Sequence, residues 1–77
     1  MHVTIARVHE NLFNGEAKSL SVPTTEGEVT ILKDHEPLVA ALKTGVVTVR
    51  SGSAILQQCT VEGGVLEVSG GQATVLL

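Results

Sequence analysis

The chain has 77 residues and a formal net charge of −3, and 43% of its residues are hydrophobic although Phe13 is its one aromatic. This length indicates a single domain over residues 1–77, with a thin core that aliphatic side chains must fill. The five Lys and Arg residues stand singly, so neither a basic patch for phosphates nor an aromatic platform for bases is available. These features exclude nucleic acid as a partner.

A lone cysteine, Cys59, cannot form an internal disulfide, which fits a reducing compartment. We interpret it as a half-buried strand residue, because a catalytic thiol needs a basic neighbour. The opening M-H-V-T-I-A-R lacks the apolar segment of a signal peptide. The longest uncharged run, residues 51–61, is interrupted by polar residues, so we expect no segment to insert directly into a membrane.

Twelve valines and eight threonines favour strands over helices, because β-branched side chains suit a pleated surface. In chain order, the pattern predicts strands over residues 2–8, 17–22, 29–32, 38–43, 46–50, 54–61, 65–68 and 73–77. The segment 38–43, L-V-A-A-L-K, has a helical composition but is too short to stand alone as a helix. Because Pro37 and Gly45 bracket it, we predict that it is extended.

Turn signals separate these strands. Asn14-Gly15 is the strongest hairpin signal and is predicted to turn the chain after the first strand. Pro23 is predicted to end the next strand, and Glu26-Gly27-Glu28 to form the turn that follows it. Three later turns are predicted at Ser51-Gly52-Ser53, Gly63-Gly64 and Gly70-Gly71.

The expected fold class is all-β, with roughly eight to ten short antiparallel strands. A flattened β-sandwich or barrel of two sheets is the economical arrangement, because either one leaves few exposed strand edges. The last strand stays apolar through Leu76-Leu77. We therefore expect that the chain was cut there or that something else normally follows it.

No residue pattern predicts covalent chemistry. His2 and His9 fall on opposite faces of an extended strand, and His35 has only its neighbours Asp34 and Glu36 beside it, which rarely all ligate one ion. Glu26 and Glu28 share one face if the segment is extended, as the two carboxylates of an acid/base pair would, but nothing in the sequence indicates a cleft around them. The paired glycines lie between strands, without the helix N-terminus of a phosphate-binding loop. We expect no catalytic residue, cofactor or metal, and a binding or scaffolding role.

Two alternatives remain open at this stage. Small valine-rich β domains also serve as lipoyl or biotinyl carriers, and Lys33 would be the modified lysine here. Its surroundings, with Leu32 before it and Pro37 soon after, differ from the D-K-A or M-K-M of such carriers. A small hydrolase would instead depend on Glu26 or Glu28.

Four motifs in register carry a resemblance that covers nearly the whole chain. They are L-F-N-G at residues 12–15, G-E-V-T-I-L-K-D-H-E-P-L at 27–38, K-T-G-V-V-T-V at 43–49 and E-G-G-V-L-E-V at 62–68. In this order and spacing the chain resembles the epsilon subunit of F-type ATP synthases, in its N-terminal β domain. The resemblance implies a flattened β-sandwich of two five-stranded sheets and a non-catalytic subunit of the central stalk.

The resemblance also implies partners and a location. The family domain docks on the gamma subunit and rests on the polar loops of the c-ring, so it couples the two in ion-driven ATP synthesis. This places it on the cytoplasmic face of an energy-transducing membrane, most simply a bacterial plasma membrane. The family's C-terminal helical pair, which restrains ATP hydrolysis, has no counterpart in these 77 residues, so that regulation is expected to be lost.

Matching positions give the candidate contact residues. Glu26, Gly27 and Glu28 correspond to the acidic turn that meets the c-ring in the family. His35, Pro37 and Leu38 correspond to the loop near the gamma subunit. The chain departs from the family pattern at Asp34 and Thr30, where glycine is usual, and at Glu62, where a small polar residue is usual. Asp34 puts a negative charge beside His35.

Overall fold

The structure, a computed structural model, describes all 77 residues and consists of nine strands joined by short turns. In chain order the strands are β1 (His2–Arg7), β2 (Glu10–Glu16), β3 (Ser19–Thr24), β4 (Gly27–Leu32), β5 (Leu38–Leu42), β6 (Gly45–Ser51), β7 (Ala54–Val61), β8 (Gly64–Ser69) and β9 (Gln72–Leu76). The predicted all-strand architecture is confirmed. The predicted extended conformation of residues 38–43 also holds, as β5.

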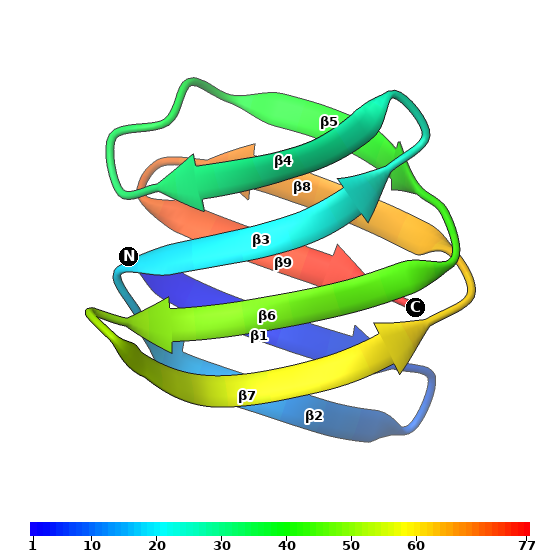
Figure 1. The fold of residues 1–77 in the computed structure, drawn as a ribbon, viewed down its shortest axis with the longest axis horizontal. Coiled ribbons are helices and arrows are strands. Elements are labelled where there is room, and N and C mark those ends of the chain that lie inside the picture. Colours follow the sequence, from blue (N-terminus) through cyan, green and yellow to red (C-terminus); the bar gives the residue numbers. More distant parts are fainter.

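The strands form two layers that face each other (Figure 1). One layer has the order β2-β1-β9-β8-β5, and the other consists of β4, β3, β6 and β7. They join at one corner, where Thr24 pairs with Leu42. There the Lys43 amide donates to the Pro23 carbonyl (2.8 Å) and the Thr25 amide donates to the Ala41 carbonyl (3.0 Å). The result is a sandwich of five and four strands that is nearly closed into a barrel.

One ladder differs from the expected antiparallel pattern. Strands β1 and β9 pair in parallel, with Val3 opposite Ala73 and Ile5 opposite Val75. A tight hairpin forces antiparallel pairing only between consecutive strands. The first and last strands share no turn, so nothing in the connectivity prevents them from running side by side in one direction.

The core lies between the two layers and is built from alternating residues of the strands. Its buried apolar side chains are aliphatic throughout: Val3, Ile5, Ala17, Leu20, Val22, Ile31, Leu42, Val47, Val49, Val61, Leu66, Val68, Ala73 and Val75. The partly buried Phe13 packs against its margin. Because a strand repeats every two residues, each inward residue leaves its neighbours on the outer face. The core therefore determines which residues remain available for contacts.

The predicted hairpin turn at Asn14-Gly15 is wrong, because both residues lie inside β2. The chain turns instead at Val8 and His9, and His9 takes the left-handed conformation with φ of 65°. Gly15 is extended and pairs with Val3. A Cβ atom built on Gly15 would lie 3.5 Å from the Phe13 ring, which is an ordinary contact, so neither a turn nor a lack of space requires glycine here.

Pro23 does not end its strand as predicted, because it lies within β3. The Pro23 carbonyl accepts from Lys43, on the side of β3 that faces β6 and β5. The β3–β6 ladder ends at Ser21, and the β3–β5 pairing begins at Thr24. Pro23 has no N–H group to donate. Because it lies between the end of one ladder and the start of the next, no ladder hydrogen bond is lost.

Two turns are shifted by one residue from their predicted places. The acidic turn consists of Thr25 and Glu26, and Gly27 already begins β4 with a φ of 121°. Gly64 likewise begins β8 instead of completing a turn with Gly63. The predicted turn at Gly70-Gly71 is present. In each shifted case a glycine, Gly27 or Gly64, supplies the first residue of the returning strand.

Candidate contact surfaces

The acidic turn is held by the side chain of Thr24. Its hydroxyl donates to the Gly27 carbonyl and accepts the Glu26 amide at 3.2 Å. Thr24 is itself buried, whereas the Glu26 and Glu28 side chains are exposed. The turn thus presents two carboxylates to solvent on a backbone that is anchored to the core, as a contact between rigid partners requires.

The second predicted contact region is the loop between β4 and β5. The His35 amide donates to the Leu32 carbonyl (2.9 Å), and the His35 ring Nδ1 donates to the Glu36 carbonyl (2.7 Å). His35 and Pro37 are exposed, while Leu38 is half-buried and packs against the core. The loop is therefore folded back on itself and leaves its histidine ring accessible.

These two regions lie at opposite ends of β4 (Figure 1). The strand has six residues, Gly27–Leu32, which corresponds to about 17 Å at the rise of an extended chain. The turns at 43–44 and 62–63 share one end of the sandwich with the acidic turn. The structure therefore does not bring the Glu26–Glu28 group and the His35–Leu38 group together, and a single partner surface would need to span the sandwich to reach both.

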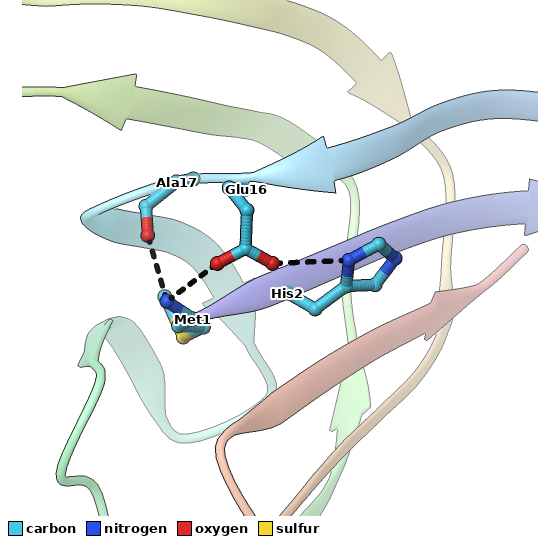
Figure 2. A network of polar contacts seen from close by, with 4 residues as sticks. All are labelled: Met1, His2, Glu16 and Ala17. Atoms are coloured by element: carbon cyan, nitrogen blue, oxygen red, sulfur yellow. Dashed lines mark hydrogen bonds and ion pairs between the residues drawn. The ribbon is translucent and has the colours of Figure 1, made fainter.

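A small polar cluster lies where β1 begins and β2 ends (Figure 2). The Met1 ammonium group lies 3.5 Å from Glu16 Oε1 and donates to the Ala17 carbonyl at 3.2 Å, and His2 Nδ1 lies 3.2 Å from Glu16 Oε2. The Glu16 side chain is largely exposed. Exposed ion pairs contribute little to stability, so we assign this cluster no role beyond aligning the two strand ends.

Cys59 lies on β7 opposite Val47 and is half-buried. Burial raises the pKa of its thiol above the ordinary value of 9.0, and the nearby Arg7 charge offsets part of that increase. The thiol is consequently protonated at neutral pH, and a protonated thiol is a poor nucleophile. This agrees with the predicted packing role.

No arrangement typical of an active site is present among these residues. His, Cys, Asp and Glu side chains form no group of three that could hold a metal ion. A hollow of about 480 Å³ brings Lys33 near Lys18 and Asp34, all three of them exposed. Every buried side-chain polar atom has a hydrogen-bond partner, so no unpaired group is aimed at a substrate. The chain also has no helix that could span a membrane.

The outer face of the five-stranded layer carries a surface that the sequence did not predict. Register places Ala41 opposite Val65, Val65 opposite Leu76, and Leu76 opposite Ala6. These four residues, which we name the apolar row, cross four neighbouring strands at one level. Leu76 is 55% exposed and Val65 is 44% exposed.

The outer face of the four-stranded layer is different in kind. At its centre, Thr30, Ser21, Thr48 and Gln58 are in register across all four strands. The Ser21 and Thr30 hydroxyls lie 3.1 Å apart, and the Gln58 amide donates to Thr48 at 3.2 Å. These side chains satisfy one another, so this face has no comparable apolar row at its centre.

Known proteins with similar sequences identify the family of this chain. A family model described as the β-sandwich domain of the ATP synthase delta/epsilon chain matches residues 1–77. The chain belongs to this family. It is 37% identical over 76 residues to an ATP synthase epsilon chain of Bordetella avium, and 40% identical over 76 residues to one of Leptospira borgpetersenii. These alignments cover 99% of the chain but only 54% and 59% of the relatives, so it spans little more than half their length.

Solved structures show the same fold as this ATP synthase domain. A chain of the Euglena gracilis mitochondrial ATP synthase, in a structure of OSCP, F1 and c-ring, matches with a TM-score of 0.86 at 27% identity, over 96% of this chain and 48% of that one. A chain from the central stalk and c-ring of the Tetrahymena thermophila enzyme matches with a TM-score of 0.81, over 97% of this chain and 60% of that one. At 16% identity the second match shows the fold alone. The predicted family and the predicted sandwich are confirmed.

Proposed function

We propose that this chain is a non-catalytic part of the central stalk of an F-type ATP synthase, where it couples the gamma subunit to the c-ring during ion-driven ATP synthesis. The observation that carries this proposal is the family match over residues 1–77. The Euglena and Tetrahymena chains come from assemblies that include a c-ring, which supports the same placement. The role needs neither a cofactor nor a metal.

The acidic turn is the proposed contact with the c-ring. Glu26 and Glu28 are exposed, and Gly27 between them takes a φ of 121° that a side chain would strain. Two carboxylates on an anchored turn can pair with a basic polar loop of the ring. Such pairing sets the register and the rate of association more than it sets the affinity.

The loop of His35, Pro37 and Leu38 is the proposed contact with the gamma subunit. His35 presents an accessible ring, and Leu38 joins the loop to the core. Because the loop and the acidic turn lie at opposite ends of β4, the domain can contact both partners at the same time. We place the assembly on the cytoplasmic face of an energy-transducing membrane, most simply a bacterial plasma membrane.

The carrier alternative has no comparable support. Lys33 is exposed in the turn after β4, as many surface lysines are, whereas all 77 residues match the ATP synthase domain family. An unmodified intact mass of the chain from its native host would exclude lipoylation or biotinylation of Lys33.

The proposal is tested by binding to two purified partners, the gamma subunit and the c-ring of the same enzyme. We expect Glu28→Lys to weaken binding to the c-ring by about tenfold and to leave gamma binding unchanged, because the carboxylate pairing is reversed at one end only. We expect His35→Ala to do the opposite. Affinities measured by isothermal titration would separate the two effects.

Matched controls keep these assignments specific. Glu62→Lys makes the same charge change on another exposed turn at the end that carries the acidic turn. His9→Asn removes a histidine from the turn between β1 and β2 and keeps a residue that tolerates positive φ. If Glu62→Lys and Glu28→Lys weaken c-ring binding equally, the loss comes from the change in net charge and not from the position of the acidic turn. An unaltered chain that binds neither partner would refute the proposed function.

A further inference from the structure

The fold gathers three of the five cationic side chains at one end of the sandwich. Lys18 lies in the turn between β2 and β3, Lys33 in the turn after β4, and Arg50 near the end of β6. Lys18 and Lys33 line one hollow of about 480 Å³, and the Lys18 amide donates to the Arg50 carbonyl at 2.9 Å. These residues stand apart in the sequence, so it is the fold that brings their charges together.

Exposed aliphatic side chains lie beside these cations on the outer face of the four-stranded layer. Register places Ser19 between Leu32 of β4 and Arg50 of β6. Ile55 of β7 is opposite Arg50 and precedes Leu56, at the bulge of that ladder. Leu32 is 57% exposed, Ile55 53% and Leu56 43%. Because this set spans three strand spacings, about 14 Å, it forms a continuous surface and not an isolated apolar side chain.

Positive charge is in excess on this surface, which we name the end patch. Its three cations form no ion pair, whereas Arg7 at the other end pairs with Glu10. Asp34 is the one carboxylate that shares the hollow with the two lysines. Uncompensated cations beside aliphatic side chains are complementary to an acidic segment that also carries apolar side chains. The end patch consists of Lys18, Leu32, Lys33, Arg50, Ile55 and Leu56.

Other occupants fit the end patch less well. A second copy cannot pair patch with patch, because cations would then face cations. Nucleic acid would place its phosphates against three aliphatic side chains, and the patch has no aromatic ring on which a base could stack. The acidic turn and the end patch lie at opposite ends of β4. If the acidic turn contacts the c-ring, the end patch therefore points away from the membrane.

We propose that the end patch docks on an acidic segment of the F1 part of the enzyme, in a subunit other than gamma; this inference rests on the proposed function. The His35–Leu38 loop, proposed to contact gamma, leads into β5 of the five-stranded layer. The end patch lies on the outer face of the four-stranded layer. Because the two outer faces of a sandwich point in opposite directions, a gamma subunit seated beside β5 leaves the end patch free for another partner.

The test measures binding of the chain to two purified partners, the F1 part of the same enzyme without this chain and the gamma subunit alone. Lys18→Glu and Lys33→Glu reverse two charges of the end patch, and Lys43→Glu makes the same change on an exposed, unpaired lysine at the other end. Leu56→Ser removes an apolar side chain from the patch and Val46→Ser removes one outside it, and both residues are 43% exposed. Isothermal titration gives the affinities, and thermal unfolding in circular dichroism checks that each variant folds.

We expect each patch variant to weaken binding to F1 by at least about tenfold and to leave binding to gamma alone within about twofold. The two control variants should stay within about twofold for both partners. An increase in NaCl from about 50 to about 300 mM should weaken F1 binding of the unaltered chain more than that of Lys33→Glu, because salt screens the attraction that this variant has lost. Lys33→Gln, which removes the charge without reversing it, is the substitute if Lys33→Glu does not fold.

Unchanged affinity of the patch variants for F1 overturns this inference, while a weakened His35→Ala variant still upholds the proposed function. Equal weakening by the control variants also overturns it, because the position of the change then has no effect. If the patch variants weaken binding to gamma alone as much as binding to F1, the assignment to another subunit is wrong. An unaltered chain that binds neither partner overturns both proposals.

Discussion

Thr24 shows how one buried hydroxyl can define an exposed contact. It accepts the Glu26 amide and donates to the Gly27 carbonyl, so the conformation of the acidic turn depends on a side chain that no partner can reach. The family motif contains the Glu26 and Glu28 carboxylates, whose chemistry is the same as that of any other surface acid. They differ from other surface acids because Thr24 holds the backbone of their turn in place.

Replacement of Thr24 by valine tests this dependence. Thr24→Val keeps the shape of the side chain and removes both hydrogen bonds, so we expect a loss of about 1–2 kcal/mol in the free energy of unfolding. Urea denaturation followed by circular dichroism measures it. Thr25→Val, at the exposed neighbouring position, is the control and should stay within about 0.5 kcal/mol. A similar loss in both variants would contradict the anchoring role of Thr24.

Cys59 predicts a pH dependence whose sign follows from its burial. The pKa of the thiol is raised in the folded chain, so the folded state holds this proton more tightly than the unfolded state does. The resulting stability is fully present below the ordinary pKa of 9.0 and is lost as pH rises through the higher folded value. Urea midpoints at pH 7.5 and 10 should therefore fall more in the natural chain than in Cys59→Ala. An equal fall in both would show that other groups control the alkaline transition.

At the scale of elements, the contact between Pro23 and Gly45 holds β3 against the start of β6. A Cβ atom on Gly45 would lie 2.7 Å from Pro23 Cβ, which is closer than real atoms approach. Gly45 does not adopt positive φ, so its requirement is for space alone. The proline that interrupts one ladder is thus packed against the glycine that opens the next strand.

Gly45→Ala should therefore destabilise the fold by about 1–3 kcal/mol through overpacking. Gly15→Ala is the matched control, because Gly15 is also an extended strand glycine and its added Cβ would make only an ordinary 3.5 Å contact with Phe13. The double variant Gly45→Ala with Pro23→Gly, which removes the Pro23 Cβ and Cγ atoms, should recover part of the loss, and thermal unfolding of all four proteins gives the coupling energy. Independent, additive losses would exclude the steric explanation.

Eight of the nine strands could be predicted from sequence, because β-branched residues and turn signals act locally, whereas β2 was missed because Asn14-Gly15 was interpreted as a turn. Residues 38–43 were correctly expected to be extended, although their composition suits a helix. Asn14-Gly15 and Pro23 misled the prediction because their roles depend on partners distant along the chain. Gly15 pairs with Val3 inside a ladder, and Pro23 lies where β3 changes partners. No local signal distinguishes these positions from ordinary turns.

Candidate contact surfaces could be proposed from sequence only where they are continuous along the chain. The acidic turn and the His35–Leu38 loop are short motifs, so a resemblance can locate them, although their contacts remain predictions. The apolar row comes from four strands, and its members Ala6 and Leu76 are neighbours only through a parallel ladder between the two ends of the chain. That register is a property of the closed sandwich. A pattern search along the chain has no means to align them.

At the scale of the whole molecule, the sandwich acts as a rigid spacer. The two joined layers separate the acidic turn from the loop by the length of β4, and the apolar row runs across a third side. That separation is kept only if both layers remain joined. The corner at Thr24 and Leu42 therefore helps to fix how far apart the two candidate contact regions lie.

Removal of β9 should abolish the fold rather than trim it. The strand lies between β8 and β1, and it contributes Ala73 and Val75 to the core. We expect a chain ending at Gly71 to show no cooperative thermal transition in circular dichroism and to be digested rapidly by protease. Removal of Leu77 alone, which takes away one hydrogen bond to Ala6 and a partly buried side chain, is the control and should cost about 1–3 kcal/mol without abolishing the cooperative transition. A cooperative transition in the shorter chain would show that β9 is dispensable.

The parallel pairing of β1 with β9 also has a consequence for biosynthesis. The ribosome releases β1 before the other eight strands, yet β9, which pairs with it, emerges after all of them. Until Gln72–Leu76 emerges, β1 and β8 each expose an unpaired edge, and the apolar interior stays open to water. Nascent chains of this domain therefore depend for a time on chaperones or on fast folding, because exposed strand edges and apolar surface promote aggregation.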